Sequence, residues 1–243
     1  APSSTIDFMS MTLGDALSEL RDRLDETPGS ETSGMWTNPS LRRRLNRGVR
    51  EVARRGECME KSTTLSFSAG VQTATMPTDM VRARKAEWYT SASSTRIPLE
   101  FRQRENLDRI WGHWQVTSQG TPEFWTSDGY PGGGAHKLLL YPTPGETGTV
   151  KLFYYYLPSD LATDGSADST SLPLPSGWED LAIDFAEHMA WRAVNDPEQA
   201  AAALQRFSDN LQAIVAASNM NYVADQPSQM IYDPQYPTDI WID

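Results

Sequence analysis

Hydrophobic residues recur at the spacing of an α-helix in four stretches of the chain, two near its beginning and two near its end. Within each stretch they follow one another at intervals of three or four residues, so that they line a single face of a helix. The second stretch shows this clearly, with Leu41, Leu45, Val49 and Val52 on one face. The four helices are predicted to span about residues 13–25, 38–56, 178–194 and 197–219.

Capping signals mark the starts of these helices. A residue that can cap is followed by an acidic residue or a proline in the first turn. The pairs are Thr12 with Asp15, Asn38 with Pro39, and Ser176 with Glu179, while Asn195-Asp196-Pro197 separates the third helix from the fourth and caps the fourth.

Between the two pairs of helices the hydrophobic period falls to two, which is typical of strands. Thr63, Leu65 and Phe67 alternate with polar residues, and the Ala69-Gly70 turn predicts a hairpin with residues 71–76. Further strands are predicted at residues 81–90, 96–102, 123–126, 137–141 and 149–157, with a short helix near residues 105–111.

This order of helices, strands and helices predicts an α+β fold. Amphipathic helices must bury their apolar faces, and they are the simplest partners for one another. We therefore expect a four-helix bundle interrupted by an inserted antiparallel β subdomain, with an extended C-terminal arm. The expected boundaries are residues 1–60 and 178–220 for the two halves of the bundle, 61–157 for the β subdomain, 158–177 for a linker and 221–243 for the arm.

Charge is distributed unevenly along the chain. The 243 residues carry a formal net charge of −11. Residues 158–243 hold 14 acids and two arginines, a net −12, which leaves +1 for the first 157 residues. An acidic protein grips nucleic acid poorly, because each phosphate contact needs a cation. A negative wall along which DNA slides without binding is compatible with this charge.

Signals for an oxidising compartment or a membrane do not emerge from the sequence. The single cysteine, Cys58, cannot form an internal disulfide, and no run of about 18 apolar residues predicts a membrane span. The first residues lack the basic start and apolar run of a secretory signal. We therefore expect cytoplasmic synthesis and no membrane association.

One helical row could supply catalytic or metal-binding groups. Asp180, Asp184, His188 and Arg192 follow one another at intervals of four residues. Residues eight apart lie about 12 Å apart along a helix, which is long for the ligands of one metal ion. We interpret the row as an exposed ladder of ion pairs and expect no catalytic, metal or cofactor site.

For the remaining histidines and the cysteine, no spacing in the sequence predicts a second group with which they could form a catalytic site. His113 and His136 lie in turn-rich sequence and are interpreted as exposed loop residues. Cys58 has acidic neighbours, which raise the pKa of a thiol, so a buried small side chain is the better interpretation. Residues 132–137 look like a phosphate-binding loop but lack its Lys-Ser/Thr ending and the helix that follows it. We therefore expect no enzymatic activity.

The second predicted helix carries the best candidate for an interaction site. Seven arginines lie between Arg42 and Arg55, opposed only by Glu51. Three interpretations are open: a solvated helix face, a contact with an acidic partner or neighbouring subunit, and direct contact with DNA. The face opposite the apolar stripe is expected to hold Arg42 and the four candidate partner-binding residues Arg43, Arg47, Arg50 and Arg54.

Aromatic residues give two further candidates. Trp111, Trp114 and Trp125 of the β region could stack on sugar rings or anchor a protein interface. The C-terminal arm has no hydrophobic period, so we expect it to bind a pocket on another chain, although packing on its own subunit or simple disorder would also explain it. Its candidate anchors are Tyr232, Tyr236, Ile240 and Trp241.

Several short motifs occur in the order found in a known family. They are Trp36-Thr37, Leu45-Asn46-Arg47-Gly48, Glu51-Val52-Ala53-Arg54-Arg55, Met76-Pro77-Thr78-Asp79, Ile97-Pro98-Leu99-Glu100, Gly120-Thr121-Pro122-Glu123-Phe124-Trp125, Leu138-Leu139-Leu140-Tyr141-Pro142-Thr143-Pro144, Tyr154-Tyr155-Tyr156-Leu157-Pro158, Leu172-Pro173-Leu174-Pro175 and Trp178-Glu179-Asp180-Leu181. From about Leu13 to Phe207 the chain resembles the head–tail adaptor family of tailed phages, especially those with short tails.

The resemblance implies a structural role in the virion. Members of that family assemble, usually in twelve copies, into a ring on the portal that extends the DNA channel and gives the tail a platform. The implied partners are the portal protein, tail or nozzle proteins and other copies of the chain, with genome DNA passing without specific binding. The implied location is the head–tail interface of a virion whose proteins are made in the host cytoplasm. The alternative is a carbohydrate-binding or tail-associated module that uses the β-region tryptophans.

Overall fold

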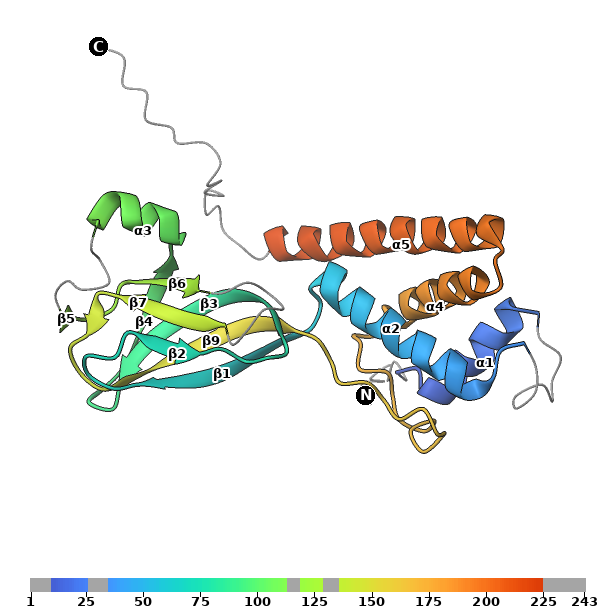
Figure 1. Cartoon of the computed structure of the whole chain (residues 1–243), viewed down its shortest axis with the longest axis horizontal. Helices are drawn as coiled ribbons and strands as arrows, with labels where there is room; N and C mark the ends of the chain where they lie inside the picture. The colour runs from blue at the N-terminus through green and yellow to red at the C-terminus, as the bar shows by residue number, and fades with distance from the viewer. Residues whose placement is uncertain (1–9, 26–34, 113–118, 129–135, 225–243) are drawn as a thin grey trace, which may run out of the picture.

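Helices and strands occupy separate parts of the molecule (Figure 1). The computed structural model describes residues 10–25, 35–112, 119–128 and 136–224. Four of its helices gather at one end, and a curved sheet with a short further helix forms the other end. The sheet lies between the two pairs of helices in the sequence, as the change of hydrophobic period predicts.

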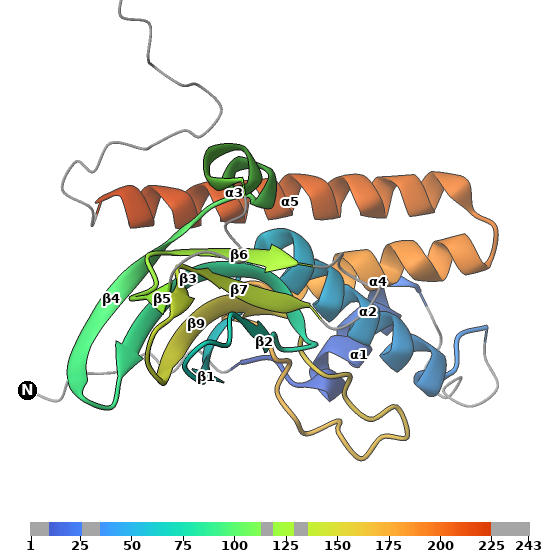
Figure 2. The same cartoon turned by 60° about the vertical axis from the view of Figure 1, so that its left-hand side comes forward.

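The helical part consists of α1 (Leu13–Arg23), α2 (Asn38–Gly56), α4 (Glu179–Ala193) and α5 (Pro197–Ala224). α4 lies in the middle and packs against the other three. α1 and α5 lie on opposite sides of it in both views (Figures 1 and 2). α5 extends beyond α4 toward the sheet (Figure 1).

The apolar stripe of α2 forms the centre of this part. All four residues predicted to line it are buried: Leu41, Leu45, Val49 and Val52. Gly48, on the same face, allows α2 and α4 to approach closely. A Cβ atom at this position would lie only 2.3 Å from the carbonyl oxygen of Ala182 in α4.

Two of the predicted helix caps are confirmed. The hydroxyl of Thr12 accepts a hydrogen bond from the backbone N–H of Asp15 (3.1 Å), and the Asp15 carboxylate accepts one from the N–H of Thr12 (3.2 Å). Asp196 caps α5 by accepting a backbone N–H (3.1 Å). The other two predictions are wrong, because α2 and α4 begin after Thr37 and Trp178, neither of which makes a side-chain cap hydrogen bond.

Residues 158–177, expected as a linker, run across α1 and α2. The backbone N–H of Leu13 donates to the carbonyl of Thr170 (2.9 Å), which satisfies a free donor at the start of α1. Asn46 of α2 makes two hydrogen bonds with the backbone of Leu161, at 2.8 and 3.0 Å. The segment is therefore fixed to the helical part along its length.

The sheet has seven strands in the order β1-β9-β3-β4-β6-β7-β2. They are β1 (Glu60–Phe67), β2 (Thr73–Thr75), β3 (Met80–Thr90), β4 (Ser93–Phe101), β6 (Phe124–Asp128), β7 (Lys137–Tyr141) and β9 (Gly148–Tyr156). The edge strands β1 and β2 lie in contact, so the sheet is nearly closed around its own buried cluster of side chains. β5 (Gln119–Gly120) and β8 (Thr143–Pro144) form a separate pair, and α3 (Arg104–Trp111) packs beside β6.

The expected four-helix bundle with an inserted antiparallel β subdomain is wrong. The four amphipathic helices are present, but they pack around α4 rather than around a common axis, and a fifth helix belongs to the sheet. The sheet is mixed, because β4 and β6 pair in parallel at Glu100 with Phe124 and at Phe101 with Trp125. Hydrophobic period shows which face of an element is buried and not which element covers it, so the arrangement was mispredicted.

The predicted hairpin at Ala69-Gly70 is also wrong. β1 pairs with β9, and β2 pairs with β7. Gly70 has a φ of +77°, and its N–H donates to the carbonyl of Pro144 (2.8 Å), so the turn is tied to β8 and β2 crosses to the far edge. The other predicted strands and the short helix are confirmed with small shifts of their ends.

Candidate functional site

Arginine side chains project from the solvent face of α2. The four candidates from the sequence, Arg43, Arg47, Arg50 and Arg54, are all exposed, which confirms their predicted orientation. They face outward because the opposite stripe of α2 is packed on α4. What they do depends on whether acidic side chains neutralise them.

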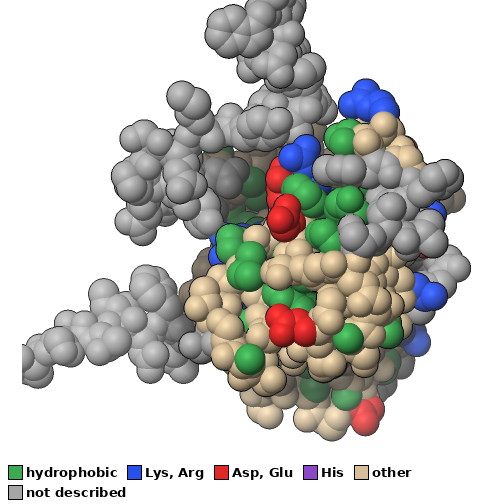
Figure 3. Space-filling view, turned by 90° about the vertical axis from the view of Figure 1, so that its left-hand side faces the viewer, with side chains coloured by type: hydrophobic (Ala, Val, Ile, Leu, Met, Phe, Trp, Pro, Cys, Tyr) green, Lys and Arg blue, Asp and Glu red, His purple; other side chains and the backbone are tan. Residues whose placement is uncertain are grey.

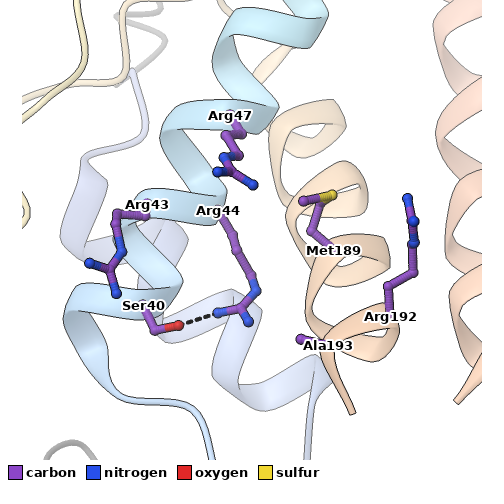
Figure 4. Close-up of a pocket in the computed structure, with 7 residues that line it drawn as sticks. All are labelled: Ser40, Arg43, Arg44, Arg47, Met189, Arg192 and Ala193. Carbon is purple, nitrogen blue, oxygen red and sulfur yellow. Dashed lines mark hydrogen bonds between the residues drawn. The ribbon is translucent and has the colours of Figure 1, made fainter. Parts of the chain in front are cut away.

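A cleft between α2 and α4 brings four arginines together (Figure 4). It has a volume of about 390 Å³ and is lined by Ser40, Arg43, Arg44, Arg47, Met189, Arg192 and Ala193. Arg44 donates a hydrogen bond to the hydroxyl of Ser40. Within the described residues, none of the four arginines makes an ion pair with a carboxylate. We call this feature the arginine cleft.

The charges in the arginine cleft repel one another. Burial, followed by the positive charges of Arg43 and Arg47, lowers the pKa of Arg44 below its ordinary value. An entering carboxylate or phosphate would relieve this repulsion and gain favourable Coulomb energy from several cations at once. Guanidinium groups stay protonated and are not nucleophiles, so the cleft suits binding of an anionic group rather than catalysis.

Farther along α2 the arginines already have acidic neighbours. Arg54 and Arg55 both bind Glu51, at 2.6 and 2.5 Å, and Arg50 lies 3.6 Å from Asp160. Burial opposes ionisation of Glu51, but the hydrogen bonds from Arg54 and Arg55 outweigh it and lower the pKa of this carboxyl. Arg50 and Arg54 are therefore partly neutralised, unlike Arg43 and Arg47.

Arg42 does not belong to the exposed face, and its predicted position there is wrong. Its side chain is buried and binds both carboxylate oxygens of Asp168, at 2.8 and 2.5 Å. It also donates to the carbonyl of Thr163 (3.4 Å). Arg42 thus fixes residues 158–177 on α2 and is not free to bind a partner.

The row on α4 is not an exposed ladder, and that interpretation is wrong. Asp184 and His188 are buried, and only Asp180 and Arg192 are exposed. His188 bonds the carbonyl of Ala200 through Nδ1 (2.7 Å). Within the described residues, no group of three or more His, Cys, Asp or Glu side chains is placed to hold a metal ion.

Asp184 instead belongs to a cluster of ion pairs that joins three helices. It accepts hydrogen bonds from Arg23 of α1 (2.7 Å) and Arg206 of α5 (3.2 Å). Arg206 also binds Glu187 of α4 (2.5 Å), and Asn210 donates to Asp184 (3.1 Å). The cluster holds α1 and α5 on α4, so its role is structural.

Of the other sequence candidates, Trp125 and His136 border the same groove, and Cys58 lies apart from them. Trp125 is 4% exposed, and its ring lies 4.8 Å from that of Phe101, so it cannot offer a face to a sugar. Cys58 is half-buried, and burial raises the pKa of its thiol to about 11. His136 is half-buried rather than fully exposed as expected.

Several candidates lie outside the part of the chain that the structure describes. They are His113, Trp114, residues 132–135, the side chain of Trp111, and the arm residues Tyr232, Tyr236, Ile240 and Trp241. Their predicted roles therefore stay predictions.

Sequence reasoning missed two members of the arginine cleft. Arg44 lies between the polar and apolar faces of α2, so helical period alone does not assign it to the site. Arg192 comes from α4, about 150 residues later in the chain, and no spacing in the sequence relates it to Arg43 or Arg47. The only signal it gave was its own charge, within a strongly acidic region.

Comparison with known proteins identifies the family. No curated protein matches the sequence. In the described part of the chain, each helix is too short or too polar to cross a lipid bilayer. The family model for the SU10 adaptor protein matches residues 11–229, which include every described helix and strand. The chain therefore belongs to the SU10 adaptor protein family and is a structural adaptor protein of a bacteriophage virion.

Proposed function

We propose that the chain is a head–tail adaptor that forms a ring of twelve copies beneath the portal. In this proposal the ring extends the DNA channel and gives the tail its attachment platform. The partners are the portal protein, tail or nozzle proteins and neighbouring copies of the chain. Membership of the adaptor family supports the general role as a phage adaptor. The arginine cleft is the main observation that supports assembly into a ring.

The arginine cleft supports a contact between unlike surfaces. It presents four cations that have no acidic partner among the described residues, in a chain whose net charge is −11. Exposed carboxylates without a cationic partner among the described residues include Asp22, Asp180 and Glu198. A cationic surface that docks on an acidic surface of the next copy is a head-to-tail contact, and such contacts close into rings.

The sheet end offers a different kind of surface, suited to tail or nozzle proteins. Large hydrophobic residues are exposed there, namely Val71, Ile97, Phe101 and Ile110. Figure 3 faces this end and shows hydrophobic side chains gathered over its middle, with acidic side chains among them. Exposed apolar groups at one end of a protein are typical of a protein–protein contact.

Genome DNA would pass along such a ring without binding specifically. Each copy contributes a net negative charge, so the wall of a channel made from many copies repels phosphate on average. The arm residues Tyr232, Tyr236, Ile240 and Trp241 are proposed to hold the portal or a neighbouring subunit.

The ring is tested by reversing charge in the arginine cleft. Wild-type protein mixed with the portal protein from the same genome is expected to form rings on the portal, as seen by electron microscopy. The Arg43→Glu/Arg47→Glu variant is expected to leave the portal bare, because the cleft then repels the acidic surface that it would bind. Rings that still form with this variant would remove the cleft from the interface, and no complex with wild-type protein would refute the proposal.

A matched control keeps the change in charge the same. Arg54→Glu/Arg55→Glu makes two equal substitutions on the same helix, where Glu51 already neutralises the arginines. We expect this variant to form rings at protein concentrations close to those of the wild type. Loss of rings in both variants would point to net charge alone rather than to the cleft.

A further inference from the structure

The arginine cleft continues into a second hollow along the same side of α2. This hollow has a volume of about 460 Å³ and shares Arg47 and Met189 with the cleft, so the two form one groove between α2 and α4. The groove follows α2 from Ser40 to Arg54, which is about 21 Å along the helix axis. A small anion would fill only part of this length, whereas a peptide segment would fit it. We call the combined feature the α2–α4 groove.

The α2–α4 groove combines positive charge with apolar side chains. Among the described residues, one carboxylate and six arginines line it. The carboxylate is that of Glu51, which already binds Arg54 and Arg55. The arginines are Arg43, Arg44, Arg47, Arg50, Arg54 and Arg192. The apolar lining consists of Leu157, Phe185, Met189 and Ala193, which are all at least partly exposed. Figure 4 shows Met189 on α4 between the arginines of α2 and Arg192. An occupant that fits has apolar side chains flanked by carboxylates.

The C-terminal arm contains a segment of this composition. Residues 225–243 hold four aspartates and no basic residue, and in Asp239–Asp243 an aspartate stands on each side of Ile240-Trp241-Ile242. In an extended chain these two aspartates are about 13 Å apart. Arg43 and Arg50 are about 10 Å apart along α2. The segment can therefore bring one carboxylate to each end of this stretch and lay its apolar side chains over Met189, which both hollows share.

The position of the α2–α4 groove favours a segment from another copy. His188, next to Met189, bonds the carbonyl of Ala200, so this part of the groove lies beside the beginning of α5. Ala224 ends α5 about 36 Å farther along the helix, toward the sheet (Figure 1). A groove beside one end of α5 and an acidic arm that follows its other end suit a contact in which each copy holds the next. Such head-to-tail contacts close into rings.

We propose that Asp239–Asp243 of one copy binds in the α2–α4 groove of a neighbouring copy. Its carboxylates pair with the arginines, and Trp241 covers the exposed parts of Phe185 and Met189. The inference rests on the proposed ring, and it identifies the acidic group that the arginine cleft takes from the next copy. The arginines of α2 and the anchors of the arm are then the two sides of one contact.

Peptide binding tests the α2–α4 groove without the portal. The probe is a fluorescent peptide with the sequence of residues 233–243, amidated at its C-terminus so that it adds no further carboxylate. The receptor is the full chain carrying Asp239→Lys/Asp243→Lys, because the arginines then repel its own segment. We expect saturable binding that Arg43→Glu/Arg47→Glu in the receptor weakens about tenfold or more. Absence of saturable binding up to about 1 mM peptide overturns the proposal.

Two controls separate recognition of the segment from a general attraction of charges. Arg109→Glu/Lys137→Glu in the receptor reverses two charges at exposed positions of the sheet part and should leave binding unchanged. A peptide with Ile240→Ser/Trp241→Ser/Ile242→Ser keeps the charge of the probe and should bind about tenfold more weakly or worse. Equal binding of the two peptides, or equal loss with both receptor variants, overturns the proposal.

Cross-linking on the portal identifies which copy provides the segment. In a Cys58→Ser background, one chain carries Ala193→Cys, at the exposed end of α4 in the groove, and a second chain carries Ile242→Cys. A short bismaleimide should join the two in mixed rings, giving a product of twice the chain mass. Internal joining of a chain that carries both cysteines would mean that the segment occupies its own groove, and it overturns the proposal. Rings that form while the peptide fails to bind would refute this inference and leave the proposed function standing, whereas peptide binding without rings on the portal would refute the proposed function alone.

Discussion

Asp184 shows how far the setting of one residue can differ from its sequence context. It occupies the polar-looking row of α4, but it is 2% exposed and binds two arginines and an asparagine from other helices. A buried carboxylate is stable only when hydrogen bonds and opposite charges replace its water. Arg23 and Arg206 supply both.

Removing this charge should destabilise the protein. Asp184→Asn leaves Arg23 and Arg206 with Glu187 as their remaining shared partner, and we expect a loss of about 2 kcal/mol in the free energy of unfolding. The value is below that of a fully buried pair because the side chain of Arg206 is half exposed. Urea denaturation measures it. Asp180→Asn, one turn earlier and exposed, should change stability by less than about 0.5 kcal/mol; equal effects would contradict this account.

Cys58 gives a prediction that depends on pH. Burial raises the pKa of its thiol from 9.0 to about 11, so at pH 8 only about one thiol in a thousand is ionised. Alkylation by iodoacetamide should therefore be slow at pH 8 and rise about tenfold per pH unit until near pH 11. In urea the rate at pH 8 should be about 100-fold higher. Fast alkylation of the native protein at pH 8 would contradict the burial.

The same shift has a consequence for stability. The folded pKa is raised, so the folded state holds the thiol proton between about pH 9 and pH 11 while the unfolded state loses it. This contribution to stability is complete below pH 9 and disappears as the pH rises through 11. Cys58→Ala should remove this part of the alkaline destabilisation in urea titrations.

At the scale of elements, the contact between α2 and α4 depends on a missing side chain. In an exposed helix, Gly→Ala stabilises by about 1 kcal/mol through helix propensity. At Gly48 the added Cβ would lie 2.3 Å from the carbonyl oxygen of Ala182, which is backbone and cannot rotate away. We expect Gly48→Ala to lower the free energy of unfolding by about 2 kcal/mol, since overpacking a core outweighs the propensity.

A control variant measures the effect of helix propensity without any change in core packing. Ala201→Gly makes the reverse exchange at an exposed position of α5 and should cost about 1 kcal/mol. Thermal unfolding of both variants, followed by circular dichroism, gives the comparison. A Gly48→Ala variant more stable than the wild type would show that α2 and α4 lie farther apart than described.

The elements also show how much of the fold follows from the sequence. Helices and strands were found where the apolar period placed them, because burial of one face is a local property of the chain. Which strand or helix an element packs against is not a local property of the chain. The pairing of β1 with β9 joins residues about 90 apart, and the parallel pairing of β4 with β6 depends on a connection through α3. No period in the sequence carries that information.

The residues of the candidate site likewise fall into those that the sequence predicts and those that it does not. Arg43 and Arg47 were found because a helix with one apolar face must expose the opposite one. Arg42 was misplaced, since residues 158–177 cover it, and Arg192 was missed, since only the packing of α4 on α2 brings it into the cleft. The sequence therefore predicted a cationic face and could not predict a cleft.

At the scale of the whole molecule, the helical and sheet parts have separate cores. Leu45 belongs to the core of the helices and Leu152 to that of the sheet, and both are fully buried. Between the parts lies a hollow of about 640 Å³, bordered by Cys58, Tyr155 and Trp178, and the exposed pair of Arg82 and Glu57 spans the junction. A junction of this kind couples two cores weakly.

Weak coupling predicts that the two parts lose structure separately. Leu45→Ala and Leu152→Ala each empty a packed site, which costs about 2–5 kcal/mol in the core concerned. Hydrogen exchange followed by mass spectrometry should show faster exchange in α2 and α4 for Leu45→Ala, with β3 and β9 unchanged, and the reverse for Leu152→Ala. Equal acceleration in both parts would mean that the cores unfold as one unit. Separate unfolding would allow the sheet end to yield to a tail component while the helices keep their contacts in the proposed ring.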